Sequence, residues 1–508
     1  MNERVKKVLN ILKKIVINNK IFGACTLLSF IVAIIFNYYN IYNGTIIIIF
    51  LYWIYSVIYC ITDLKRNSLI LIMLLCFFTF IISRPLISLF RGDEWWYFSD
   101  VAISKALISI FLSLAFIMIG NKIYLHILYK RNDNKINFKK TNINRRKIIK
   151  AKKVLVNRYF ESKIIFVIFC FVIITGVFCL YMEVSNYISL HGIDYSKVYT
   201  AAVPNHNIIV RVMSSLYIYI FILYLVTMPK KKYVYILLMF FIITSVPSFL
   251  LGSRNVLVLR VIFSLLYVFF RNYTRYYDEV WITKKIKIAL MVSVPIFVVF
   301  MGAYNYIRAD ENIDSSPMEL IVDTFYKQGT TFDTICQGFE YEEKLKDNKK
   351  ISYSFGDIID YLVHNTISQK IFSTKAFPSG NSLIVVREGN SLAHKLSYYV
   401  LGEFSYLDGH GRGTSYILET YMDGSYLWLS LYSILLGVYL TIFFDLINKN
   451  KVLLSFIVLM SIYEIFLLPR FSASGFISFV IKPQFWAVYL LFYYGNIIYL
   501  KEFNYEKK

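Results

Sequence analysis

Long apolar runs, separated by short polar segments, dominate the chain. Three of them, Leu69–Phe80, Ile164–Tyr181 and Tyr233–Ser245, are almost unbroken and lack the polar face of a helix on the surface of a soluble protein. With their mildly polar neighbours, such runs reach about 20 residues, the length with which a helix crosses a hydrocarbon core. The pattern therefore predicts an all-α polytopic membrane protein.

Along the whole chain the same pattern predicts about 12 transmembrane helices. They are expected at residues 21–39, 43–62, 68–88, 101–121, 163–183, 208–228, 233–251, 254–271, 287–306, 424–446, 452–469 and 474–499. This divides the chain into three parts: helices 1–9 in residues 1–306, a large helical loop in 307–423, and helices 10–12 with a tail in 424–508. An even number of spans puts both termini on one side of the membrane.

Charge placement indicates which side that is. Of the 55 lysines and arginines, 35 lie in the segments on the same side as the termini, including the basic linker 121–162. The loop 307–423 instead holds 17 acidic residues against 11 basic ones. Because basic loops stay in the cytoplasm, both termini are expected there and the large loop outside. The net charge of +23 then reflects anionic lipid rather than nucleic acid.

Composition and motifs exclude several kinds of chemistry. The chain is 57% hydrophobic, and five of its six cysteines fall inside apolar runs, which is typical of structural thiols. It contains no Walker loop, dinucleotide fingerprint, zinc signature or nucleophile elbow. No metal and no cofactor is therefore expected.

Ionisable residues at the outer ends of the predicted helices are the first candidate site. Charged groups within a membrane are costly and are usually functional. Five arginines occupy this level: Arg84, Arg254, Arg260, Arg308 and Arg470. Each could merely extend its head to the interface or pair with a carboxylate, and a structurally held lipid headgroup is also compatible with them. Together they favour binding of a lipid-linked phosphate or diphosphate, because guanidinium groups bind phosphate through two hydrogen bonds and keep their charge.

The stretch from Asp408 to Asp423, at the end of the large loop, is the second candidate site. Gly409, Gly411 and Gly413 allow a close approach of the backbone, and a helix expected from about Ser415 presents amide groups to an anion. A flexible turn before helix 10 is the alternative explanation for the glycines.

Three side chains in this stretch suit proton transfer or sugar binding. His410 is the best-placed imidazole for general base catalysis. Glu419 and Asp423 are four residues apart on one helical face, where they accept protons, bind sugar hydroxyls or solvate a helix end.

These residues carry a resemblance to the Wzy-type O-antigen and capsule polymerases. The resemblance covers the topology and rests on Gly252-Ser-Arg254, on Gly411-Arg-Gly-Thr-Ser-Tyr-Ile-Leu-Glu419 followed by Tyr421-Met-Asp-Gly424, and on Arg470 after helix 11. Asn255 stands where many members have a second glycine after Gly-Ser-Arg. The resemblance implies a metal-independent glycosyl transfer of the GT-C class. A glycan on undecaprenyl diphosphate would move onto a hydroxyl of the next lipid-linked repeat unit.

Site roles follow from the resemblance as expectations. Arg254, Arg470 and Arg308, with Arg84 and Arg412 in addition, are expected to bind the diphosphates. His410 or Glu419 is the expected base, and Asp423 and Tyr416 are expected to bind glycan.

The resemblance also implies partners and a location. These are a lipid-linked oligosaccharide, membrane lipid and, as a candidate partner, a chain-length regulator protein. The location is the bacterial cytoplasmic membrane. The alternatives are an O-antigen ligase of the same fold class and a lipid-linked oligosaccharide flippase or other transporter.

Overall fold

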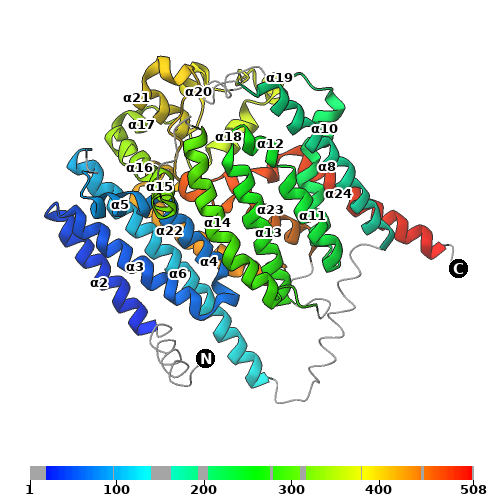
Figure 1. The fold of residues 1–508 in the computed structure, drawn as a ribbon, viewed down its shortest axis with the longest axis horizontal. Coiled ribbons are helices and arrows are strands. Elements are labelled where there is room, and N and C mark those ends of the chain that lie inside the picture. Colours follow the sequence, from blue (N-terminus) through cyan, green and yellow to red (C-terminus); the bar gives the residue numbers. More distant parts are fainter. Residues whose placement is uncertain are drawn as a thin grey trace. The chain divides into compact units, whose positions relative to one another are not determined.

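The structure is a computed structural model that describes residues 19–94, 97–138, 162–192, 204–274, 279–308, 316–378, 380–447 and 451–505. All regular secondary structure in these ranges is helical (Figure 1). The all-α fold class predicted from the apolar runs is therefore confirmed. Most of the basic linker 121–162 lies outside the described residues, and its first part continues helix α6 as far as Phe138.

Within the described ranges, ten helices are long and apolar enough to cross a membrane. An eleventh is added if η3 (Gly475–Ile481) and α24 (Pro483–Tyr505), which bend by 59° where they meet, form one span. The shorter apolar helix α23 (Val452–Ile465) completes the set. Each of the twelve expected segments thus coincides with helical structure, and the chain is a multi-pass membrane protein.

The chain folds into two compact units. Unit 1 comprises residues 1–136, 295–443 and 466–474, and unit 2 comprises 137–294, 444–465 and 475–508. Helix α14 (Lys284–Arg308) contributes its first part to unit 2 and its second part to unit 1.

The membrane helices of unit 1 come from the start of the chain and from α22. They are α2 (Asn19–Tyr38), α3 (Tyr42–Thr62), α4 (Leu64–Phe77) with η1 (Phe78–Ile82) and α5 (Ser83–Arg91), α6 (Asp100–Phe138) and α22 (Tyr416–Ile447). Helix α3 packs between α2 and α4 (Figure 1). Helices α6 and α22 cross closely, since a Cβ atom on Gly437 would lie 2.1 Å from the Ile117 carbonyl oxygen. Small residues permit such crossings in membranes.

A π-helical turn interrupts the third span just before its arginine. Residues Phe78–Ile82 form η1, and Arg84 and Pro85 follow in the first turn of α5. Proline has no N–H group to donate to the preceding turn, and a single π turn is a common way for a helix to absorb such a defect. The turn sets the direction in which α5 presents Arg84.

Short helices fill the large segment between α14 and α22. They are α15 (Pro317–Gln328), α16 (Thr331–Glu340), α17 (Glu342–Asp347), α18 (Gly356–Val363), α19 (Thr366–Phe372), α20 (Leu383–Glu388) and α21 (Leu392–Leu407). Local sequence explains the start of α15, where Ser316 and Glu319 form a capping box and Pro317 takes the first helical position. The predicted helical character of 307–423 therefore holds for its described part, 316–378 and 380–423.

Helix α22 is broken near its start. Gly424 and Ser425 leave the helical conformation, and Ser425 has a φ of 54°. The chain therefore forms a short helix up to Asp423, followed by a continuous helix from Tyr426. The eighteen residues from Tyr426 to Phe443, at 1.5 Å per residue, span about 27 Å, close to the thickness of a hydrocarbon core.

Unit 2 is a bundle with an aromatic core. Its helices, besides the first part of α14, are α8 (Ser162–Leu190), α10 (Ile208–Val226), α11 (Lys231–Ile243), α12 (Val246–Leu250), α13 (Arg254–Thr274), α23, η3 and α24. Helix α10 packs against α8, α23 and α24. Phe221 and Phe241 stack with ring centroids 4.4 Å apart inside the bundle.

Candidate active site

An arginine–carboxylate pair lies at the junction of α15 and α16. Arg84 places its Nε 2.9 Å from Asp333 Oδ2, and the two side chains are 19% and 17% exposed. The guanidinium also lies 4.5 Å from the centre of the Tyr326 ring. Gly329 permits this approach, because a Cβ atom there would lie 2.5 Å from the Cβ of Arg84. Helix α5 and the junction together fix the position of Arg84.

Arg470 reaches the same junction from a distant part of the sequence. It ends the turn η2 (Leu468–Arg470), and its Nη1 donates to Gln328 Oε1 at 2.9 Å. Its guanidinium lies 5.9 Å from the centre of the Phe80 ring in η1. Gln328 is the residue before Gly329, so Arg470 and Arg84 are brought together at the end of α15.

Arg412 is the third arginine of this group. Its backbone N–H donates to Ser397 Oγ at 2.9 Å, and its carbonyl oxygen accepts from Thr334 Oγ1 at 3.2 Å. Helices α21 and α16 thus fix its backbone, while the side chain is exposed. The positive charge of Arg412 acts on Asp333, the residue next to Thr334. We call Arg84, Arg412 and Arg470 the arginine cluster.

Asp333 is a carboxyl group that interacts with two arginines of this cluster, Arg84 and Arg412. Burial raises its pKa to about 6, although Arg84, a hydrogen bond with Tyr97 and Arg412 all act in the opposite direction. Sequence reasoning missed Asp333. It stands in the first turn of a short amphipathic helix, where a carboxylate is common on a solvated face. Its arginine partners come from other elements, so no local pattern marks it.

Glu419 lies in the first turn of α22 and is only 2% exposed. Its Oε2 accepts a hydrogen bond of 2.8 Å from the backbone N–H of Ala473. Ala473 follows Arg470 by three residues, so the Glu419 carboxylate holds the turn that carries this arginine. The structure therefore links Glu419 to the arginine cluster through the backbone.

His410 is exposed on the surface before α22. Its Nε2 lies 3.5 Å from Asp408 Oδ2, and both side chains are about half exposed or more. Asn381 holds the backbone by donating to the His410 carbonyl oxygen at 2.9 Å. The described contacts do not include one between His410 and Glu419, so the two expected bases occupy different surroundings.

Tyr416, expected to bind glycan, is fully buried. Its hydroxyl shares a hydrogen bond with Ser113 Oγ, which lies 3.1 Å from Ser433 Oγ. These contacts tie the start of α22 to α6. That Tyr416 binds glycan stays a prediction.

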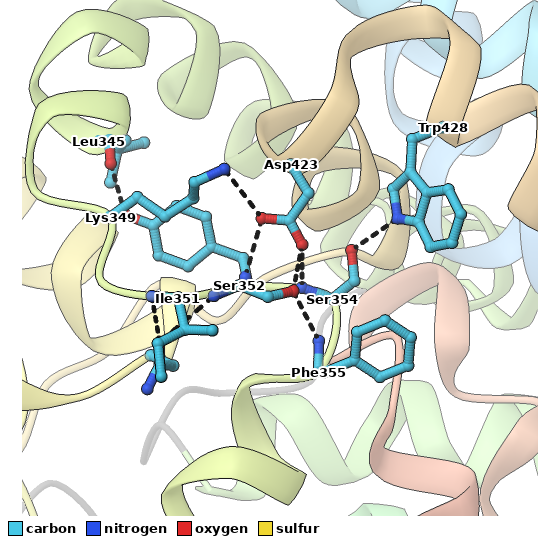
Figure 2. Close-up of polar contacts among 10 residues, drawn as sticks. Leu345, Lys349, Ile351, Ser352, Ser354, Phe355, Asp423 and Trp428 are labelled. Atoms are coloured by element: carbon cyan, nitrogen blue, oxygen red, sulfur yellow. Dashed lines mark hydrogen bonds and ion pairs between the residues drawn. The ribbon is translucent and has the colours of Figure 1, made fainter.

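Asp423 holds a loop against the break in α22 (Figure 2). It accepts hydrogen bonds from the backbone N–H groups of Tyr353 and Ser354 at 2.9 and 2.8 Å, and from the Ser352 hydroxyl. Lys349 Nζ lies 3.6 Å from the same carboxylate. Asp423 is thus occupied by the loop between α17 and α18.

The remaining predicted arginines are described within their own surroundings. Arg254 begins α13 in unit 2, after Gly252 with a φ of 96°. Arg260, also in unit 2, is buried and donates to the Phe241 carbonyl oxygen at 2.8 Å and to the Thr244 hydroxyl. Arg308 ends α14, and its side chain lies outside the described residues. That all of these converge with the arginine cluster stays a prediction.

The described residues contain no group of three or more histidine, cysteine, aspartate or glutamate side chains placed to hold a metal ion. The groups described above, from Arg84 to Asp423, are guanidinium groups, carboxylates and an exposed imidazole. Such a set suits binding of a phosphorylated ligand together with proton transfer.

Comparison with known families identifies the family. The model of the family described as O-antigen polysaccharide polymerase Wzy matches residues 21–502. The chain belongs to this family. Neither the comparison with curated proteins nor that with solved structures gave a match.

Membership of the Wzy family confirms the resemblance that the glycine-rich motif and the arginines had indicated. It implies a polysaccharide polymerase that joins O-antigen repeat units, with a lipid-linked oligosaccharide as substrate and membrane lipid as its surroundings. In this Wzy family chain the arginine cluster is a set of positively charged groups that suits a phosphorylated ligand.

Proposed function

We propose that this chain moves a growing glycan from undecaprenyl diphosphate onto a hydroxyl group of the next lipid-linked repeat unit. The reaction takes place at the outer face of the bacterial cytoplasmic membrane, and both termini lie in the cytoplasm. The observation that carries the proposal is the arginine cluster around Asp333, in which Arg84 and Arg470 meet at the end of α15.

The cluster suits a diphosphate leaving group. When the bond between the sugar and the diphosphate breaks, negative charge develops on the phosphate oxygens, and fixed positive charge stabilises that state. Three guanidinium groups against the single carboxylate of Asp333 leave an excess of two positive charges at the α15–α16 junction. Arg254 and Arg308 keep their expected role as further diphosphate ligands in this proposal.

These fixed cations support the metal-independent, GT-C-like character of the proposal. In many phosphoryl and diphosphate reactions a divalent ion neutralises the charge that develops. Arginine does the same with hydrogen bonds from a rigid fork. Arg84 is well suited to this, because its Nε is already directed by Asp333 and its guanidinium by Tyr326.

We assign the two expected bases different roles. His410 is accessible and stands beside Asp408, and its ring takes the proton of the acceptor hydroxyl. Glu419 is buried and bonded to Ala473, so it positions the turn that carries Arg470. Replacement of His410 should therefore alter the pH profile of polymerisation, whereas Glu419→Gln should act through substrate binding.

A deletion strain tests this function by gel analysis of its surface polysaccharide. Loss of the gene should leave single repeat units, and the wild-type chain should restore long polymer. Arg470→Ala should give at least about tenfold less polymer at equal protein level, a loss of about 1.4 kcal/mol of transition-state binding.

Arg91→Gln is the matched control for this experiment. Arg91 is on the same helix as Arg84 and pairs with Asp323 of α15 at 2.6 Å. It lies 5.3 Å from the centre of the Tyr326 ring, farther than Arg84 does, and its described ion pair does not involve Asp333. An exposed pair of this kind contributes about 1 kcal/mol at most, so polymer should persist. Long chains left on the carrier in the deletion strain would instead indicate a ligase. Repeat units retained on the cytoplasmic side would indicate a transporter.

A further inference from the structure

A pocket of about 480 Å³ opens in unit 1 where α22 breaks. One wall is the loop between α17 and α18, with Lys349, Ile351 and Phe355, and the other is the first turn of the continuous part of α22, with Leu427, Trp428 and Leu431.

The loop wall of the pocket is rigid. Asp423 accepts hydrogen bonds from Ser352, Tyr353 and Ser354, and the Trp428 indole N–H donates to Ser354 Oγ at 3.2 Å (Figure 2). From the other side, Asn390 Oδ1 accepts from the Ile351 N–H at 2.9 Å. A preformed wall of this kind loses little conformational entropy when a ligand binds.

The helix wall of the pocket continues as an apolar stripe. Leu427 and Leu431 line the pocket, and Leu435 follows at the same helical spacing. These three side chains are 82%, 45% and 56% exposed. Because they lie on the part of α22 that is long enough to cross the hydrocarbon core, the stripe leads from the pocket along the lipid-facing surface.

One cation stands at the opposite side of this apolar surface. Lys349 Nζ is 3.6 Å from Asp423, beyond hydrogen-bonding distance, and its side chain is 28% exposed. Asp423 already accepts three hydrogen bonds from the loop, so its pairing with Lys349 is loose. Lys349 can therefore donate to an anion at the pocket mouth without breaking the contacts that hold the loop.

We propose that this pocket binds the isoprenoid chain of a lipid-linked oligosaccharide at the end next to its phosphate, with the phosphate on Lys349. The inference rests on the proposed function and names the place of one of its two lipid substrates. The apolar stripe favours a hydrocarbon chain. A sugar fits the pocket less well, because the Asp423 carboxylate, which would accept hydrogen bonds from sugar hydroxyls, is already bonded to the loop. Asp423 lies four residues, or about 6 Å along the helix, from Glu419, whose carboxylate accepts from the backbone N–H of Ala473, three residues after Arg470. The arginine cluster and the pocket thus flank the same short helix.

Photo-crosslinking tests the pocket directly. Benzoylphenylalanine is placed at Leu427 or, as the control, at Leu51 of α3, which is 54% exposed but lies outside the pocket. The full-length protein in nanodiscs of phosphatidylglycerol and phosphatidylethanolamine is mixed with undecaprenyl diphosphate, irradiated and analysed by mass spectrometry. We expect about tenfold more undecaprenyl diphosphate adduct at position 427 than at 51, equivalent to about 1.4 kcal/mol of preference. Equal yields at both positions would refute the pocket.

Charge variants test the phosphate contact. Lys349→Gln should lower the adduct at position 427 severalfold, whereas Lys350→Gln, its exposed neighbour outside the pocket lining, should not. Competition with excess lipid is the second check. If excess phosphatidylglycerol suppresses the adduct at position 427 as strongly as excess undecaprenyl diphosphate does, the pocket is a general lipid site and the proposal is overturned.

Polymer formation in cells separates the pocket proposal from the proposed function. If the pocket variant Leu427→Trp leaves polymer unchanged in cells while Arg470→Ala abolishes it, the pocket proposal fails and the proposed function stands. If Arg470→Ala also leaves polymer unchanged, the proposed function fails as well.

Discussion

The charge of Asp333 depends on the fold of the site. Burial raises its pKa from an ordinary 3.8 to about 6, so folding favours the neutral carboxyl. The raised pKa adds to the free energy of unfolding at low pH. This contribution is complete below about pH 4, where the carboxyl is also neutral in the unfolded chain, and it is lost as pH rises through about 6. Between these values the wild-type protein should therefore lose stability with rising pH.

Asp333→Asn tests this dependence, because asparagine keeps the shape of the carboxyl and cannot ionise. The difference in melting temperature, variant minus wild type, should increase from pH 4 to about pH 6.5 and stay constant above pH 6.5. Thermal unfolding of the detergent-purified proteins at a series of pH values measures the difference. A difference that stays constant or falls over this range would show that Asp333 does not titrate as described.

At the residue scale, the sequence predicted the arginines better than it predicted their partners. Arg84 and Arg470 stand out because a charge at the end of an apolar run is unusual. Asp333 and Gln328 are ordinary polar residues of short helices, and only the fold brings them to those arginines. For the same reason the sequence could not show that Asp423 is occupied by the loop 352–354.

At the element scale, the crossing of α6 and α22 is the contact that fixes the broken helix in unit 1. Gly120 and Gly437 face the backbone of the opposite helix, and a Cβ atom on either would lie within 2.2 Å of a carbonyl oxygen. Near the crossing, Asn121 donates to Asn67 at 3.0 Å and to Thr441 at 2.8 Å. Backbone atoms cannot move aside as a flexible side chain can, so the crossing tolerates little added volume.

Gly437→Leu should therefore destabilise the protein by about 3 kcal/mol, the upper end of overpacking costs. The matched control is Gly23→Leu in α2, where an added Cβ atom meets nothing within 4 Å. The amount of each variant in the membrane fraction and its melting temperature after purification provide the measurement. Equal levels and melting temperatures for the two variants would show that the close crossing does not limit the fold.

Helix positions were predictable because an apolar run of membrane length has few other structures available to it. The interruptions within those helices were harder to predict. The break at Gly424 and Ser425 lies beside the loop that Asp423 holds, and the π turn lies just before Arg84 and Pro85. Neither interruption is marked by a change in the hydropathy of its segment. Both lie beside the candidate site, where departures from regular structure are common.

At the scale of the whole molecule, the account combines family membership with two features of unit 1. The family implies polymerisation of lipid-linked repeat units. We propose that the arginine cluster provides positive charge for one diphosphate, and that the pocket at the break of α22 provides an apolar surface for a second lipid. The cytoplasmic position of the termini and the outer position of the large loop remain predictions from the distribution of basic residues.

Polymerisation by the purified chain is the most direct test of this account. The protein, reconstituted in lipid vesicles, is given a single defined repeat unit on undecaprenyl diphosphate, with chelator present, and the products are separated by length. The account predicts a ladder of oligomers with release of undecaprenyl diphosphate, at least about tenfold less with Arg84→Ala or Arg470→Ala, and little change with Arg91→Gln. An undiminished ladder with both cluster variants, or no product longer than one repeat unit with the wild-type chain, would contradict it.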